Sequence, residues 1–120
     1  MLNFTEYGAK NPKIFLLLHN GQEENLKDWN DMIVKLSKQY HVIAPDLPAR
    51  NLNHDEAVSY AKKVYDIIKH KDIECLCSLR ENWALTNILI DDYNIQPTHS
   101  LLEMQRSTPN SLLSEILQCS

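Results

Sequence analysis

The apolar stretch Ile14–Leu18 is the feature that most constrains the fold. All five of its residues are large and apolar, and no polar residue alternates with them. A strand with one face in water would alternate, so this unbroken run predicts a strand buried on both faces, as in a parallel sheet. His19-Asn20-Gly21 follows as a turn. Helices are therefore expected on both sides of a sheet.

Helical and extended patterns alternate after this run. Residues spaced by three or four positions form one apolar helical stripe, namely Leu26, Trp29, Ile33, Leu36 and Tyr40. A second buried strand is expected at His41–Ala44. The next helix is capped by Asn53 or Asp55, and its inner face carries Ala57, Ala61, Val64 and Ile68. Residues 73–79 then predict a third strand and residues 81–90 a third helix, an order typical of right-handed crossovers in a parallel sheet.

The two ends of the chain differ from this pattern. Residues 2–7 predict an edge strand, antiparallel if it joins the sheet directly. Pro97 is expected to end the secondary-structure element before it. Leu101, Leu102 and Met104 then suggest a short helix. Thr108-Pro109 begins another helix, whose apolar face carries Leu112, Leu113, Ile116 and Leu117. We therefore expect a three-layer αβα fold with a short, mostly parallel sheet of three or four strands in residues 1–93. A helical tail, residues 94–120, would pack on this core or on a partner chain.

Composition excludes several classes of function. A chain of 120 residues forms one domain or part of a larger one. Its only glycines, Gly8 and Gly21, cannot build a phosphate-binding loop or a dinucleotide fingerprint, so no nucleotide cofactor is expected. The net charge of −4 without a basic stripe argues against nucleic acid as a partner.

Membrane, metal and redox chemistry are not expected either. The longest apolar block is too short to cross a bilayer, and the first residues lack a signal-peptide pattern, which favours the cytoplasm and no membrane partner. The histidines are scattered, without metal-binding spacing. Cys75, Cys77 and Cys119 are an odd set and are interpreted as reduced thiols.

The order of these motifs resembles the N-terminal half of the α/β-hydrolase fold family. The matching pieces are Phe4, Tyr7 and Gly8 before the first buried strand, Leu18–Gly21 at the oxyanion loop, Asp28-Trp29 in the following helix and Tyr40–Pro48 at the end of the next strand. The resemblance covers about residues 2 to 90, three quarters of the chain. It implies a truncated α/β-hydrolase-like fold.

The resemblance also implies where a catalytic site would lie. The family's nucleophile occupies a G-x-S-x-G turn, where bulky neighbours would collide with the facing strand or helix. Alignment on Ser78 places Leu76 and Arg80 at the glycine positions, and a shift by one residue places Leu79 at the nucleophile position. Ser78 is therefore the candidate nucleophile. His99, the one histidine that follows it in the sequence, is the candidate base. The candidate oxyanion or ligand-binding residues are His19, Asn20, Gly21, Asp46 and Leu79.

Two functional interpretations from different classes follow, and a decayed gene product without a biochemical role is a third. In the first, the chain has lost catalysis and acts as a small-molecule-binding or protein-interaction module. In the second, it is a residual serine esterase that uses Ser78, with a base from His99 or from a second subunit. If the chain ends the sheet at residues 73–79, the open edge or the tail helices would favour a homodimer or a partner protein.

Overall fold

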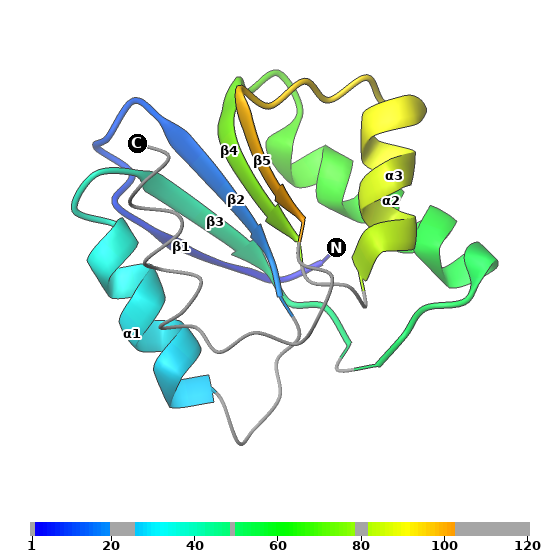
Figure 1. Cartoon of the computed structure of the whole chain (residues 1–120), viewed down its shortest axis with the longest axis horizontal. Helices are drawn as coiled ribbons and strands as arrows, with labels where there is room; N and C mark the ends of the chain where they lie inside the picture. The colour runs from blue at the N-terminus through cyan, green and yellow to red at the C-terminus, as the bar shows by residue number, and fades with distance from the viewer. Residues whose placement is uncertain (1, 20–25, 49, 79–81, 103–120) are drawn as a thin grey trace.

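The computed structural model describes residues 2–19, 26–48, 50–78 and 82–102 (Figure 1). The elements of this part are β1 (Phe4–Tyr7), β2 (Ile14–Leu18), α1 (Leu26–Leu36), β3 (His41–Pro45), α2 (His54–Ile68), β4 (Ile73–Ser78), α3 (Trp83–Asp91) and β5 (His99–Leu102). Of the side chains in this part, those of residues 26–29, 101 and 102 are not described. None of the helices in these ranges combines the length and apolar character needed to cross a bilayer.

The strands form one sheet in the order β1-β3-β2-β4-β5. β2 is parallel to both of its neighbours, and β4 is parallel to β5. β1 runs antiparallel to β3, from the pair Phe4 and Pro45 to the pair Tyr7 and Val42. The predicted antiparallel edge strand and the mostly parallel sheet are both confirmed.

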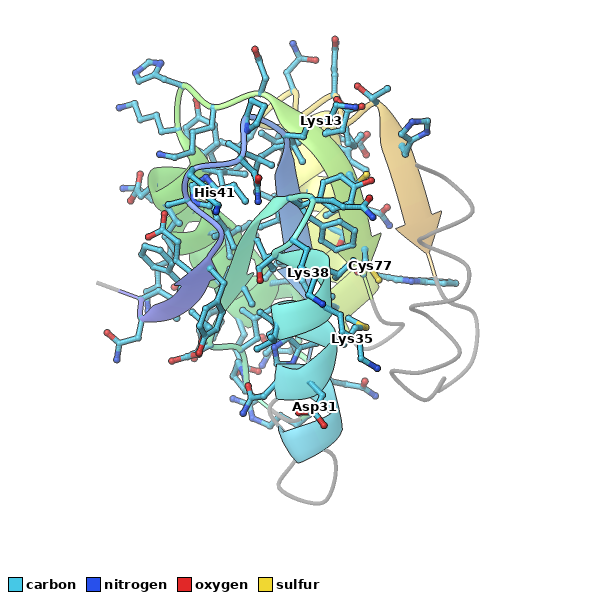
Figure 2. The ribbon with its side chains drawn as sticks, turned by 90° about the vertical axis from the view of Figure 1, so that its left-hand side faces the viewer. Lys13, Asp31, Lys35, Lys38, His41 and Cys77 are labelled. Atoms are coloured by element: carbon cyan, nitrogen blue, oxygen red, sulfur yellow. The ribbon has the colours of Figure 1, made fainter. Side chains whose placement is uncertain are left out.

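Helices cover both faces of this sheet, as the sequence predicts. Phe15 and Leu17 of β2 pack in one core cluster with Met32 and Ile33 of α1. Leu16 and Leu18 pack in a second cluster on the opposite face, with buried residues of α2 and α3. α1 therefore forms one outer layer, and α2 with α3 forms the other (Figures 1 and 2). The α/β class and the three-layer arrangement predicted from the alternating strand and helix patterns are confirmed.

α2 begins where the sequence indicates. Asn53, not Asp55, is its N-cap, and its side chain accepts a hydrogen bond from the backbone N–H of Glu56 at 2.9 Å. The Glu56 carboxylate accepts in turn from the Asn53 N–H at 3.2 Å, which completes a capping box. The four predicted inner residues, Ala57, Ala61, Val64 and Ile68, are all buried.

A tight turn joins β1 to β2 and fixes both against the end of α1. Gly8 has a φ of 70°, in the left-handed region. A β-carbon at this position would lie 2.4 Å from the carbonyl oxygen of Tyr40 and 2.7 Å from that of Ser37. The Asn11 side chain donates to the same two carbonyls, at 3.1 and 2.7 Å. The turn therefore needs glycine for both its backbone angle and its space.

The prediction for the start of the tail is wrong. Residues 99–102 form the strand β5, parallel to β4, where the sequence suggested a helix around Leu101 and Leu102. In the described part of the chain the sheet accordingly has five strands, not three or four, and β4 is an inner strand. Two adjacent leucines fit either a helix or a short strand, and pairing with β4 decides between them. The helix expected from Thr108-Pro109 lies outside the described residues.

Candidate functional site

The carboxyl ends of β2 and β4 form the position where an open α/β sheet usually binds its ligands. β2 and β4 are neighbours, and Leu18 is the register partner of Ser78 at their ends. The chain leaves β2 toward α1 on one face and leaves β4 toward α3 on the other. Because the two connections diverge, a crevice can form between them, at the topological switch point. His19 and Ser78 are therefore brought to adjacent strand ends.

Ser78 ends β4 inside the protein. Its exposed fraction is 0%, and its hydroxyl oxygen lies 2.7 Å from the hydroxyl oxygen of Thr86 in α3. The Thr86 hydroxyl donates its proton to the backbone carbonyl of Asn82 at 2.8 Å. Since a hydroxyl has one proton, Ser78 is the donor in the bond between the two side chains. The Ser78 proton therefore points to a hydroxyl oxygen in the core, across the connection from β4 to α3.

Asn82 joins the beginning of α3 to the end of β2. The residue is fully buried, and its Nδ2 donates to the carbonyl of Leu18 at 3.0 Å. Its Oδ1 and the indole Nε1 of Trp83 are buried without a hydrogen-bond partner among the described residues. Such groups are costly in a protein interior. The polar groups at the switch point therefore have only some of their hydrogen bonds among the described residues.

Sequence reasoning did not select Asn82 or Thr86. Both belong to the region predicted as helical, where polar residues usually face water. Their contacts depend on how the chain turns between β4 and α3, and residues 79–81 lie outside the described part. The one available signal is the spacing of four between Asn82 and Thr86, which lets a threonine hydroxyl reach the carbonyl one turn earlier.

The other candidate site residues are dispersed. His19 follows β2 directly and is half-buried. Asn20, Gly21 and Leu79 lie outside the described residues. Asp46 follows β3 and is exposed, and its backbone N–H donates to the carbonyl of Asn3 at 2.9 Å. β2 separates β3 from β4, so Asp46 and Ser78 end strands about 10 Å apart.

His99 lies at the opposite end of its strand from the switch point. It begins β5, is exposed, and is the register partner of Cys75. The register partner of Ser78 is Leu102, three residues further along β5. At about 3.3 Å per residue, His99 begins about 10 Å along the sheet from the Ser78 position. The structure does not bring this histidine to the serine.

The largest pKa shift among the described residues is that of Glu56, at the start of α2. Arg50 Nη1 donates to Glu56 Oε1 at 2.8 Å, and Nη2 donates to the second carboxylate oxygen. The hydrogen bond from Arg50, followed by the backbone bond from Asn53, lowers the pKa of Glu56 to about 2. This ion pair secures the capping box near the carboxyl edge of the sheet.

Two hollows in the described surface lie away from the switch point. One of about 520 Å³ lies at the amino end of β4, between Lys71–Glu74 and residues 94–98. Another, of about 400 Å³, lies along α2 beside Val58, Lys62 and Tyr93. Within the described ranges, no three His, Cys, Asp or Glu side chains gather as a metal site would require.

Comparison with known proteins finds a partial likeness to a solved structure. No protein-family model matches the chain, and no curated protein matches it. A solved structure of 1H-3-hydroxy-4-oxoquinoline 2,4-dioxygenase is similar to 73% of this chain, with 20% sequence identity and a TM-score of 0.49. The chain spans 36% of the length of that enzyme. At this identity the likeness concerns the path of the chain and not its chemistry.

Proposed function

We propose that this chain is an α/β-hydrolase-like binding or interaction module that does not use Ser78 as a nucleophile. The observation that carries the proposal is the direction of the Ser78 proton. A catalytic serine gives its proton to a base during attack. Here the hydroxyl is fully buried and donates to Thr86, whose own proton goes to the Asn82 carbonyl.

The position of His99 supports the same proposal. A general base must come within hydrogen-bond distance of the proton it removes, about 3 Å. The register of β5 places His99 beside Cys75, about 10 Å along the sheet from the end of β4. It is also exposed to solvent.

The proposed binding region is the switch point. His19 directly follows β2 in this region. The Asn82 side chain donates a hydrogen bond to the Leu18 carbonyl and so connects the start of α3 to the end of β2. A module that binds at this edge of the sheet without using the nucleophile would hold a small molecule or a partner segment there. Asp46 lies one strand further along the same edge and would contribute a charge at its rim.

One observation favours a residual esterase as the second candidate. Leu18 and Ser78 are register partners, so His19 directly follows the residue paired with the serine. If the connection after β4 changed so that the Ser78 hydroxyl became exposed, an imidazole would lie at the end of the neighbouring strand. The base in that case is His19 or a histidine of a second subunit, and not His99.

Activity measurements separate the two candidates. Hydrolysis of p-nitrophenyl acetate and labelling by a fluorophosphonate probe are compared for the wild type, Ser78→Ala, His19→Ala and His99→Ala. We expect equal, near-background hydrolysis in all four proteins and no labelling of Ser78. A loss of hydrolysis in Ser78→Ala and His19→Ala, with His99→Ala unchanged, would establish the esterase instead.

Association with a second copy or another protein is part of the proposal. β5 ends the sheet, and its outer edge has no strand neighbour among the described residues. Such an edge offers backbone donors and acceptors to another chain. Sedimentation velocity over a hundredfold range of concentration tests self-association, and a constant monomer would contradict a homodimer.

A further inference from the structure

Val58 lies on the outer side of α2 and leaves much of an apolar side chain in solvent. Its exposed fraction is 44%, whereas Ala57 and Ala61 of the same helix are fully buried. A single exposed valine is ordinary, and Val34 of α1 is exposed to a similar degree, 51%. The two valines differ because Val58 lines the hollow of about 400 Å³ along α2, whereas Val34 lines neither of the two hollows described above.

Two aromatic contacts hold the walls of this hollow in place. Tyr93, which follows α3, stacks on Tyr65 of α2 with the ring centroids 4.6 Å apart and an angle of 26° between the rings. The ammonium nitrogen of Lys63 lies 5.0 Å from the centre of the Tyr60 ring. Tyr93 and Lys63 both line the hollow, and each contact restricts a side chain that would otherwise rotate freely. The walls are therefore formed before any ligand binds.

The charged groups around the hollow are two lysines and one aspartate. Lys62 lies one helical turn after Val58, Asp66 lies one turn after Lys62, and Lys63 is next to Lys62. Within the described residues, neither lysine takes part in an ion pair. Ser59 adds a hydroxyl group to the same lining. The hollow therefore combines an apolar wall with an excess of positive charge, in a chain whose net charge is −4.

We propose that this hollow binds a small aromatic carboxylate, with the ring against Val58 and Tyr93 and the carboxylate at Lys62 and Lys63. Its volume lies within the range of small-molecule sites, about 300 to 1,000 Å³. The ring removes the exposed valine from water, and the ammonium groups donate charge-assisted hydrogen bonds to the carboxylate. Asp66 repels a second negative charge, so the ligand carries one carboxylate. The site is separate from the switch point and does not depend on the proposed function.

Two probes with the same ring and opposite charges test the proposal on the full chain. 2-Naphthoate is the anion and 2-naphthylmethylammonium is the cation, and each is titrated into the ¹⁵N-labelled protein while amide chemical shifts are recorded. We expect 2-naphthoate to bind saturably with a Kd of about 1 mM, a value ordinary for a ligand of its size. The shifted amides should be those of residues 58–66 and 93, and the cation should bind at least about fivefold more weakly.

Matched variants on two helices test the roles of the residues. Lys62→Gln combined with Lys63→Gln should weaken 2-naphthoate binding about fivefold, and Val58→Ser should weaken it about threefold. Lys35→Gln and Val34→Ser make the same changes on α1 and should leave the Kd unchanged. All of the replaced side chains are exposed, and circular dichroism checks that each variant folds.

Three results would overturn the proposal. The first is the absence of saturable shifts in residues 58–66 and 93 up to about 10 mM 2-naphthoate, ten times the expected Kd. The second is equal binding of the anion and the cation, which would leave no role for the lysines. The third is equal weakening by the α1 and α2 variants. Shifts confined to residues 17–19 and 82–86 would place the ligand at the switch point, which would support the proposed function and reject this site.

Discussion

The hydroxyl groups of Ser78 and Thr86 lie 2.7 Å apart in the interior, and both residues are fully buried. This contact crosses the connection between β4 and α3. Thr86 also donates to the Asn82 carbonyl at 2.8 Å, so one hydroxyl links the end of the strand to the first turn of the helix. The Ser78 hydroxyl therefore faces a side chain of the core at the point where the chain leaves β4.

Thr86→Val should destabilise the protein by about 2 kcal/mol. Valine has nearly the same shape, but it leaves the Ser78 hydroxyl without its acceptor and the Asn82 carbonyl without its donor. Thr86→Ser keeps the hydroxyl and should cost only about 1 kcal/mol for the lost methyl group. Urea unfolding of the two variants measures the difference. Equal losses would mean that the hydroxyl-to-carbonyl chain contributes nothing to stability.

Glu56 should make the stability of the fold depend on pH in the acid range. Its pKa is lowered to about 2 in the folded state from its ordinary value of 4.5, so the unfolded chain binds its proton first as the pH falls. The contribution of the carboxylate is therefore complete above pH 4.5 and is lost as the pH falls through about 2. In Glu56→Gln this contribution is absent, and the stability difference from the wild type should shrink between pH 5 and pH 2.

Arg50→Gln serves as the matched variant for this prediction. It keeps the capping-box carboxylate and removes the guanidinium that contributes most to the lowered pKa of Glu56. Its unfolding should be less dependent on pH than that of the wild type. A wild type and an Arg50→Gln variant with parallel curves over this range would contradict the assignment.

The local elements of the fold were predictable because each depends on neighbouring residues. The unbroken run Ile14–Leu18 indicated a strand buried on both faces, and a capping residue, Asn53 or Asp55, before the apolar stripe indicated the start of α2. β5 was not predicted, because a segment of four residues is too short to show a hydrophobic period. The pairing with β4 that stabilises it joins segments that are far apart in the sequence.

The candidate site was predictable only in part, for a related reason. Strand order brings His19 and Ser78 to adjacent ends, and both were candidate site residues because of the resemblance of the motif order. The partner of the Ser78 hydroxyl was not predictable, because Thr86 reaches it through the geometry of a turn and not through a sequence pattern. Similarly, the distance of His99 from Ser78 follows from the register of a strand that the sequence did not indicate.

Gly8→Ala should destabilise the protein by about 2 to 3 kcal/mol. The φ of 70° is unfavourable for alanine, and its β-carbon would overlap the Tyr40 and Ser37 carbonyl oxygens. Asn94→Gly is the control, since Asn94 also has a positive φ, of 56°. Glycine adopts a positive φ without steric strain, so Asn94→Gly should change stability by less than about 1 kcal/mol. Thermal unfolding of a Gly8→Ala protein at the wild-type temperature would contradict the steric argument.

Asn82→Asp should destabilise the protein more than Asn82→Ala. The amide of Asn82 donates to the Leu18 carbonyl at 3.0 Å while its Oδ1 has no partner among the described residues. Alanine loses the donor but also removes the unsatisfied oxygen, so its cost should be about 1 to 2 kcal/mol. Aspartate sets a buried carboxyl oxygen against the carbonyl, which adds the penalty for burying an unpaired charge or for protonating it. Urea unfolding ranks the two variants, and hydrogen exchange in the first turn of α3 should be faster in both. If Asn82→Asp is the more stable of the two variants, a hydrogen-bond donor must lie near the Oδ1 position. The polar groups at the switch point would then have more partners than the described contacts include.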